Sequence, residues 1–267
     1  MMPTKSYMKF LDMMNSKTSH LLLIACILLF ASCNHKNDKL VSIQAQEILI
    51  DEHISEVDSI VAYIAPFRDR IEQVLDSSLA YAPWPLTKGD GKYNTSVGNF
   101  MADVIYSEAN PIYEARTGND IDFALLNHGG IRADIPKGIV NARTAYEIMP
   151  FENNIVVVDL PGKSVLNLVE YLIKARRPHP VSHMEIVLNR NNTLHRLKIN
   201  GEPFDVNRTY HVATSSYLVT GGDNMTFFKG MTGSLDTDYL LRNAIIDYFK
   251  KVDTLTAKVD DRFIKLN

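Results

Sequence analysis

The sequence has only two cysteines among 267 residues, and it carries no excess of charge of either sign. So few thiols exclude a scaffold held by disulfides and a cysteine-rich zinc site. A net charge of −3 gives no electrostatic basis for binding nucleic acid. Glycine and proline, at 13 and 11 residues, are too sparse for a collagen-like or low-complexity chain. The remaining composition, 46% hydrophobic and 22% charged, is that of a globular protein with one large or two small domains.

The longest apolar run, Leu21 to Phe30, lies near the start of the chain. It is about half as long as a membrane-spanning helix. Lysines precede it and small residues follow, which is typical of a secretory signal. Ala31-Ser32-Cys33 resembles a bacterial lipobox, so we expect a lipoprotein signal peptide at 1–32 and acylation of Cys33. The alternative is an ordinary signal peptide followed by a chance cysteine.

Cleavage before Cys33 would remove Cys26 and leave the remaining cysteine acylated. The mature chain would then have no free thiol, which excludes nucleophilic cysteine catalysis. Residues 33–47 would form the lipidated cysteine and a polar tether. The expected location is the cell envelope, as a lipoprotein anchored to a membrane on its periplasmic or outer-membrane face.

Apolar residues at steps of three and four predict helices within about 40–80, 97–105, 165–173 and 241–249. Pro66 is expected to divide the first of these into two helices, and Pro111 to lie beyond the end of the second. Asn94 is the expected N-cap of that second helix. Short apolar runs predict strands at 121–126, 155–160, 184–188, 194–199, 210–215 and 263–266. Together these elements predict a mixed α/β or α+β domain.

Polar residues, glycines and aromatics gather in loops beside three of the predicted strands. The loops are 127–132 (NHGGIR), 150–154 (PFENN) and 217–224 (YLVTGGDN). Taken alone, each is better explained without a ligand: Gly-Gly and Gly-Gly-Asp are common in turns, and Phe151 on a loop is more often a hydrophobic plug. Their occurrence at three strand ends, with two aromatics, an arginine and an aspartate, favours a joint binding site.

The motifs Asn-x-Gly-Gly-Ile-Arg, Pro-Phe-x-Asn and aromatic-x-x-x-Gly-Gly-Asp occur here in this order. They resemble the C-terminal, substrate-binding domain of the 5′-nucleotidase and UDP-sugar hydrolase family. Val97 to Asp103 also resembles the first helix of that domain. The resemblance covers about residues 48–267. It implies a layered α/β/β/α domain at 87–267, preceded at 48–86 by the helical connector that joins two domains in larger members.

In that family the domain binds a nucleoside by stacking its base between aromatic rings. The resemblance implies that Phe151 and Tyr217 stack on the base and that Asn127 faces it. Arg132 and Asp223 would contact the ribose or nearby groups. The full set of implied substrate-binding residues is Asn127, Arg132, Phe151, Asn153, Tyr217, Gly222 and Asp223.

One stretch departs from the family pattern. Family members usually carry an arginine, and often a glutamate, just before the first helix. Here the stretch from Gly91 to Thr95 holds Lys92 instead, which we expect to substitute for the arginine without its planar fork.

The larger family members carry an N-terminal metallophosphatase domain with two metal ions, and such sites need several His, Asp and Asn ligands. Asp51-Glu52-His53 has the opening Asp-x-His spacing, but no Gly-Asn-His or His-x-His motif follows. We therefore assign no catalytic residue and no metal to this chain. The divalent metal pair is expected on a partner phosphatase chain. His179 and His183 are expected to be solvated, whereas His128 can contact a ligand.

Three hypotheses follow. The first is a lipid-anchored nucleotide- or nucleoside-recognition domain of a split 5′-nucleotidase, which depends on a separate metallophosphatase chain for hydrolysis. The second is a lipoprotein that binds nucleosides or another small aromatic ligand without an enzyme partner. The third is an autonomous hydrolase, which the available metal ligands do not support.

Overall fold

The structure is a computed structural model that describes residues 20, 21, 24, 40–49, 51, 54–175 and 177–266. The chain divides into two units, residues 1–56 and 57–267. In the first unit, residues 40–49 form neither helix nor strand. Most of the predicted signal peptide, and Cys33, lie outside the described residues. Among the helices that are described, none is long and apolar enough to cross a membrane.

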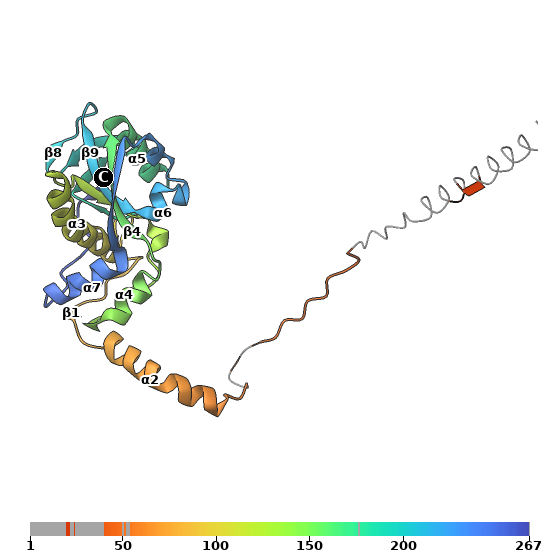
Figure 1. Cartoon of the computed structure of the whole chain (residues 1–267). Helices are drawn as coiled ribbons and strands as arrows, with labels where there is room; N and C mark the ends of the chain where they lie inside the picture. The colour runs from red at the N-terminus through yellow and green to blue at the C-terminus, as the bar shows by residue number, and fades with distance from the viewer. Residues whose placement is uncertain are drawn as a thin grey trace, which may run out of the picture. The chain divides into compact units, whose positions relative to one another are not determined.

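The second unit contains the elements that build the domain, and Figure 1 shows their arrangement. Its helices are α2 (Asp58–Leu75), α3 (Ser96–Thr117), α4 (Ala142–Ile148), α5 (Gly162–Ala175), α6 (Ser216–Val219) and α7 (Leu241–Lys251). Three short 3₁₀ helices are η1 (His128–Gly130), η2 (Gly222–Asn224) and η3 (Thr226–Gly230). The strands are β1 (Ala80–Ala82), β2 (Phe123–Leu125), β3 (Gly138–Val140), β4 (Asn154–Pro161), β5 (Val181–Ser182), β6 (Met184–Leu188), β7 (Leu194–Ile199), β8 (Glu202–Pro203), β9 (Thr209–Ser215), β10 (Gly233–Leu240) and β11 (Phe263–Lys265).

A five-stranded sheet in the order β10-β4-β9-β2-β5 is the centre of the domain. Strand β9 is parallel to β2 and antiparallel to β4. The carboxyl ends of β2 and β9 and the amino end of β4 therefore meet at one edge of the sheet. The loops that follow β2 and β9 and precede β4 are the three loops singled out in the sequence.

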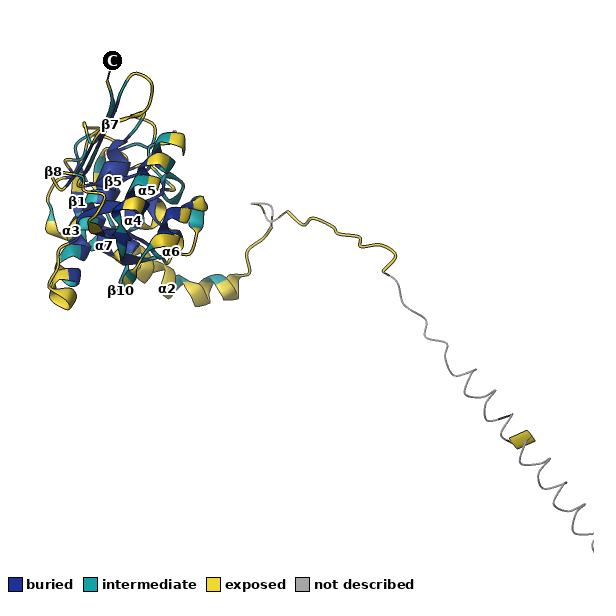
Figure 2. Cartoon of the chain, turned by 90° about the horizontal axis from the view of Figure 1, so that it is seen from above, coloured by how far each residue is buried: buried dark blue, intermediate teal, exposed yellow. Residues whose placement is uncertain are grey.

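Both faces of this sheet are buried, which is why β4 reads as a continuous apolar run. Ile155 and Val157 face a core formed with α3, α4 and α7, and Val156 and Val158 face a second core. Helix α5, the four-stranded sheet β11-β6-β7-β8, and the segment of α6 and η3 also contribute to the second core. Figure 1 shows β4 and β9 between α3 on one side and α5 on the other, and Figure 2 shows the interior as buried. The predicted mixed α/β class is confirmed.

Among the described residues of the connector predicted at 48–86, α2 is the helical part. The helix runs through Pro66, so the predicted division into two helices is wrong. The end of the predicted connector belongs to the domain, because β1 pairs with β3. Pro111 also lies inside a helix, α3, rather than beyond its end. Buried Tyr113 in the following turn anchors α3 to the core and offsets the backbone hydrogen bond that a proline removes.

Asn94 does not cap α3, as the sequence suggested. Thr95 is the N-cap, and its side chain accepts a hydrogen bond from the Gly98 N–H. The Asn94 side chain instead binds the last segment of the chain, donating to the carbonyls of Asp260 (2.9 Å) and Phe263 (3.2 Å). Its Oδ1 accepts from the Asp260 N–H, and the whole side chain is buried. Asn94 therefore holds β11 against the start of α3.

This role predicts that Asn94→Leu is more destabilising than loss of the cap. Leucine would leave the buried groups around Asp260 without partners, which costs about 2–4 kcal/mol in total. The matched control, Thr95→Ala, removes one cap and costs about 1 kcal/mol. Urea unfolding of both variants measures the difference. Equal losses would show that the Asn94 side chain contributes no more than a cap.

Candidate functional site

The three loops at the edge of the five-stranded sheet line one cavity of about 360 Å³. Its lining residues are Asn127, Gly129, Gly130, Arg132, Phe151, Asn153, Tyr217 and Asp223. Six of the seven predicted substrate-binding residues are thus brought together. The seventh, Gly222, lies directly beneath the Tyr217 ring, because a Cβ at this position would be 2.3 Å from Tyr217 Cε1.

The loop after β2 turns sharply so that its backbone comes close to the cavity. Asn127 precedes η1, and its buried side chain lies over the following glycines. A Cβ at Gly130 would be 2.6 Å from Asn127 Oδ1, so a larger residue would displace that amide. The Gly-Gly pair in the sequence motif therefore makes room for the Asn127 side chain.

The loop after β9 presents a carboxylate. Asp223 lies in the left-handed region at φ 50° and ψ 24°, in η2. Its backbone carbonyl accepts a hydrogen bond of 2.8 Å from the Tyr171 hydroxyl on α5. The Tyr217 hydroxyl lies 3.4 Å from its Oδ1. These contacts fix where the Asp223 carboxylate lies at the cavity wall.

A direct hydrogen bond joins the first and third loops. Asn127 Nδ2 donates to Asp223 Oδ2 at 2.8 Å, between residues 96 positions apart in the chain. Because a carboxylate can accept about four hydrogen bonds, Asp223 keeps capacity for a ligand. This hydrogen bond joins the two loops into one wall of the cavity.

The loop before β4 supplies Phe151, a residue that is 41% exposed. The loop after β9 supplies Tyr217, which is 44% exposed. Arg132 lies over the Phe151 ring, with its guanidinium carbon 5.8 Å from the ring centroid. Two large aromatic faces and a guanidinium thus border the same cavity. Exposed aromatic faces of this kind can stack on a planar ligand.

Arg242 of α7 supports that loop, and none of the three sequence motifs includes this residue. Its buried guanidinium donates to the carbonyl of Pro150 at 3.1 Å and stacks 4.2 Å over the Tyr146 ring. It also lies 3.6 Å from the Glu152 carboxylate. Arg242 therefore positions the backbone that carries Phe151.

Two histidines lie behind the first loop. The His128 backbone N–H donates to His179 Nδ1 at 3.3 Å, and His179 packs against Tyr171. The prediction that His179 is solvated is wrong, because the side chain is buried. Burial lowers the pKa of His179 to about 4, and burial together with the Lys88 charge lowers the pKa of His128. His183 is exposed and stacks on Tyr106, away from the cavity lining.

Lys92 does not take the place of the missing family arginine, because it lines a different cavity. Lys88 comes to the site instead: its ammonium donates to the Ile131 carbonyl in the first loop. Its backbone N–H is held by Asp134 at 2.7 Å. Lys92 was expected at the site because it closely precedes α3. The loop from Thr87 to Thr95 folds back before the helix begins, so closeness in sequence does not bring Lys92 to the cavity.

Within the described residues, no three His, Cys, Asp or Glu side chains come together in a way that could hold a metal ion. His53, of the Asp-x-His spacing, lies outside them. The donor set of the cavity, with one carboxylate, amides, an arginine and aromatic rings, does not match a two-metal phosphoesterase centre. It matches a site that recognises a flat, polar molecule by stacking and directional hydrogen bonds.

Comparison with known proteins identifies the domain. The model of the family "5′-nucleotidase, C-terminal domain" matches residues 86–230. Protein UshA of Escherichia coli is 26% identical over 223 residues, which cover 81% of this chain and 38% of UshA. The trifunctional nucleotide phosphoesterase protein YfkN of Bacillus subtilis is 29% identical over 235 residues, covering 80% of this chain and 15% of YfkN.

The solved structures agree. The 5′-nucleotidase precursor of Thermus thermophilus superposes with a TM-score of 0.64 at 25% identity, covering 79% of this chain and 43% of that one. The NAD nucleotidase of Haemophilus influenzae shares the fold, with a TM-score of 0.59 at 18% identity.

The structure is thus a mixed α/β domain with a cavity at one end of its central sheet. The chain belongs to the 5′-nucleotidase C-terminal domain family. It spans well under half the length of the curated relatives it matches here, 38% in the case of UshA.

The buried histidine behind the site predicts a specific acid sensitivity. An unfolded histidine titrates near about pH 6.5, so the unfolded state binds a proton that folded His179, with a pKa of about 4, does not. Stability is therefore unaffected by this group above about pH 6.5 and falls between there and pH 4, by on the order of 3 kcal/mol.

Urea unfolding between pH 7 and 4.5 tests this with His179→Gln, which keeps an acceptor for the His128 N–H but does not titrate. The wild type should lose about 2–3 kcal/mol more than the variant across this range. Parallel losses in the two proteins would contradict the assignment.

Proposed function

We propose that this chain recognises the nucleoside part of a nucleotide for a 5′-nucleotidase-type phosphoester hydrolase, in which a separate metallophosphatase chain supplies the divalent metals and the hydrolytic step. Membership of the family supports binding of a nucleotide substrate. The observation that carries the proposal is the cavity at the sheet edge, where Phe151, Tyr217, Arg132 and Asp223 lie together.

Each part of the cavity has a matching part of a nucleoside. The faces of Phe151 and Tyr217 would stack on the base, and such stacking contributes about 1–3 kcal/mol per base. The Asp223 carboxylate would accept hydrogen bonds from ribose hydroxyls, and Asn127 and Asn153 would offer amide groups to the base edge. Arg132, beside Phe151, would donate to the ribose or to the phosphate that follows it.

The nucleoside is the part of the substrate that does not react. Binding it in this cavity would place the phosphate ester at the partner's metals. Binding energy from the non-reacting part of a substrate lowers the entropic cost of positioning the reacting part. The chain's own residues would bind and orient, and the metals of the partner would activate water.

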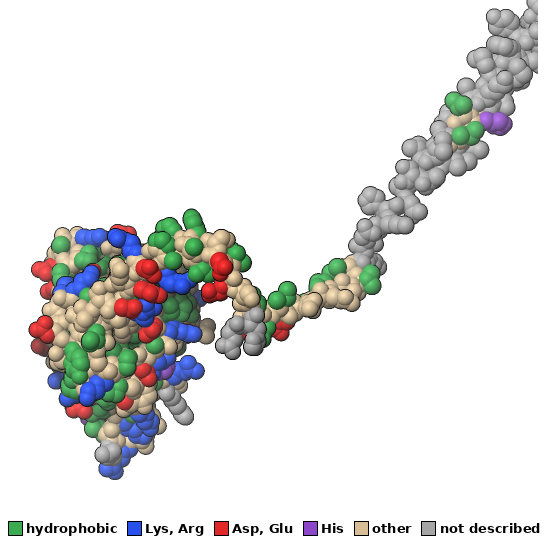
Figure 3. Space-filling view, turned by 90° about the horizontal axis from the view of Figure 1, so that it is seen from below, with side chains coloured by type: hydrophobic (Ala, Val, Ile, Leu, Met, Phe, Trp, Pro, Cys, Tyr) green, Lys and Arg blue, Asp and Glu red, His purple; other side chains and the backbone are tan. Residues whose placement is uncertain are grey.

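Helix α2 supplies a surface for that partner. Every residue of this 18-residue helix is at least partly exposed. One face is an apolar stripe, here called the α2 stripe, made of Ile60, Ile64, Phe67, Ile71 and Val74. Figure 3 shows hydrophobic side chains at the surface along this helix. The Arg143 guanidinium fixes the end of α2 to the domain through Asp76, at 2.6 Å and 3.0 Å.

An exposed apolar stripe of this length favours a bound protein over solvent. We therefore propose that the α2 stripe binds the metallophosphatase chain. An exposed surface of this kind favours the split enzyme over a lipoprotein that binds its ligand without a partner. The anchor predicted at Cys33 would hold the assembly at the membrane of the cell envelope.

Truncating either aromatic ring should weaken nucleoside binding without unfolding the domain. Isothermal titration of adenosine and uridine should show saturable binding to the wild type. Phe151→Ala and Tyr217→Ala should each weaken it by about 10- to 100-fold, which corresponds to one lost stacking contact. Tyr81→Ala, at an equally exposed tyrosine on β1, is the control and should bind like the wild type. Equal weakening in the control, or no binding by the wild type, would refute the nucleoside site.

A charge on the α2 stripe should abolish cooperation with the partner and spare ligand binding. Added wild-type chain should lower the KM of the cognate metallophosphatase for a nucleoside monophosphate by about tenfold, because it supplies binding energy for the nucleoside. Phe67→Asp should lose this effect and keep its affinity for nucleosides, since burying an unpaired charge in an interface is unfavourable. Ala62→Asp, on the opposite side of α2, should retain the effect. An unchanged KM with wild-type chain would contradict the split-enzyme proposal.

A further inference from the structure

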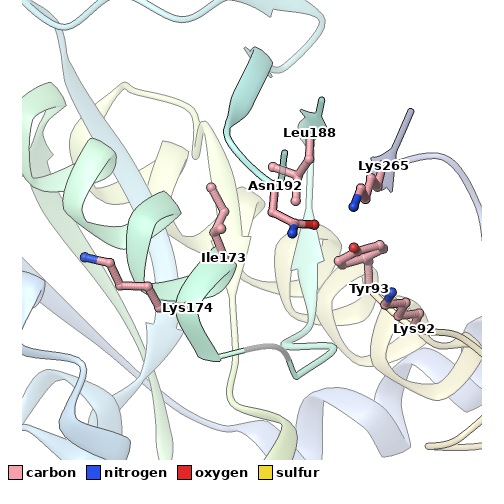
Figure 4. A pocket seen from close by; sticks show the side chains of 7 residues that line it. All are labelled: Lys92, Tyr93, Ile173, Lys174, Leu188, Asn192 and Lys265. Carbon is pink, nitrogen blue, oxygen red and sulfur yellow. The ribbon is translucent and has the colours of Figure 1, made fainter. Parts of the chain in front are cut away.

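A second, larger cavity lies outside the site described above. Its volume is about 510 Å³, and it shares no lining residue with the nucleoside site. Figure 4 shows its lining residues, which are Lys92, Tyr93, Ile173, Lys174, Leu188, Asn192 and Lys265. They come from the loop before α3, the end of α5, the hairpin between β6 and β7, and β11. An adjoining hollow repeats Lys92, Tyr93 and Lys265 and adds Arg190 and Leu266.

The charges around this cavity are all positive. Lysines and an arginine line the two hollows, and no Asp or Glu does. Lys174 is paired with Glu170 at 3.2 Å, and in Figure 4 its side chain extends away from the others. Lys92 and Lys265 make no ion pair with any described residue. Two lysines that lack an ion-pair partner among the described residues therefore line this space.

The polar ends of several side chains converge. Figure 4 shows Lys265, Tyr93 and Asn192 lying around one space, with Lys92 beside Tyr93. The Tyr93 ring is held in place by stacking on Phe263, with centroids 5.0 Å apart and planes at 29°. Lys92 Nζ lies 5.2 Å from the centroid of the same ring. Ammonium, hydroxyl and amide donors are thus aimed into a cavity from three separate elements.

The opposite part of the cavity is apolar. Leu188 is buried at the end of β6, and Ile173 is half-buried at the end of α5. A ligand here meets cationic donors on one side and aliphatic side chains on the other. This combination, at this volume, is typical of a small-molecule site.

We propose that this cavity binds a small phosphomonoester, with its phosphate between Lys92 and Lys265 and its apolar body against Ile173 and Leu188. A phosphomonoester carries nearly two negative charges at pH 7, matching two ammonium groups. Its oxygens can also accept from the Tyr93 hydroxyl and the Asn192 amide. A neutral or singly charged ligand would leave one ammonium without a partner. The site is independent of the proposed nucleoside function, because no residue is common to both.

Isothermal titration of the full-length chain with n-hexyl phosphate tests the proposal, with hexan-1-ol and inorganic phosphate as partial probes. Hexyl phosphate should bind saturably and more tightly than either probe. Lys265→Ala and Lys92→Ala should each weaken binding about tenfold, the size expected for one charge-assisted hydrogen bond. Lys163→Ala removes the same charge from the start of α5, outside the lining of both hollows, and it should leave the affinity within about twofold.

A soluble short-chain lipid, dihexanoyl phosphatidylglycerol, distinguishes a phosphomonoester from a lipid headgroup. Weaker binding of this singly charged diester supports the proposal, and tighter binding overturns it in favour of a headgroup. No saturable binding of hexyl phosphate, or equal weakening by Lys163→Ala and Lys265→Ala, also overturns it. Phe151→Ala should bind hexyl phosphate normally, so failure of the nucleoside site and failure of this site are separately visible.

Discussion

The pairing of β9 with β2 on one side and β4 on the other is the constraint on which the rest of the site depends. Because β9 is parallel to β2 and antiparallel to β4, three loops far apart in sequence must meet at one sheet edge. Seven backbone pairs from Ile155 to Pro161 fix the register of β4 on β9. Sliding that register by one residue would turn Ile155 and Val157 out of their core, so the burial of both sheet faces also fixes the loop positions.

The site is held together by the protein rather than by a ligand. Asn127 binds Asp223 across two loops, Arg242 supports the backbone around Phe151, and Tyr171 fixes the Asp223 carbonyl. Asn127 and Asp223 belong to the cavity lining, whereas Arg242 on α7 and Tyr171 on α5 support the loops from outside it. Phe151 and Tyr217 remain exposed despite their size. Their rings therefore contribute little to burial in the core, but they are free to stack on a ligand. A preformed site of this kind loses little conformational entropy on binding.

Elements whose pattern lies in consecutive residues can be predicted from the sequence, whereas elements that depend on distant segments cannot. The runs 184–188 and 194–199 give β6 and β7 as predicted, since burial of a strand is written in consecutive residues. Strand β10 was missed, although Leu235, Thr237 and Tyr239 alternate toward the core, because Asp236 and Asp238 obscure the pattern. The short strands β1 and β3 and helix α4 were also missed, as they depend on pairing and packing with distant segments. The three loop motifs located the cavity residues. Tertiary contacts bring three further residues next to the site loops: Arg242, Lys88 and His179. The spacing of residues along the sequence does not reveal such contacts.

The proposed function depends above all on the exposed rings of Phe151 and Tyr217 receiving a nucleobase. The most direct test is a crystal structure of the chain soaked with adenosine or uridine. We expect the base between these two rings, with a ribose hydroxyl within hydrogen-bond distance of the Asp223 carboxylate. A nucleoside bound elsewhere on the domain, or an empty cavity at a saturating nucleoside concentration, would contradict the claim.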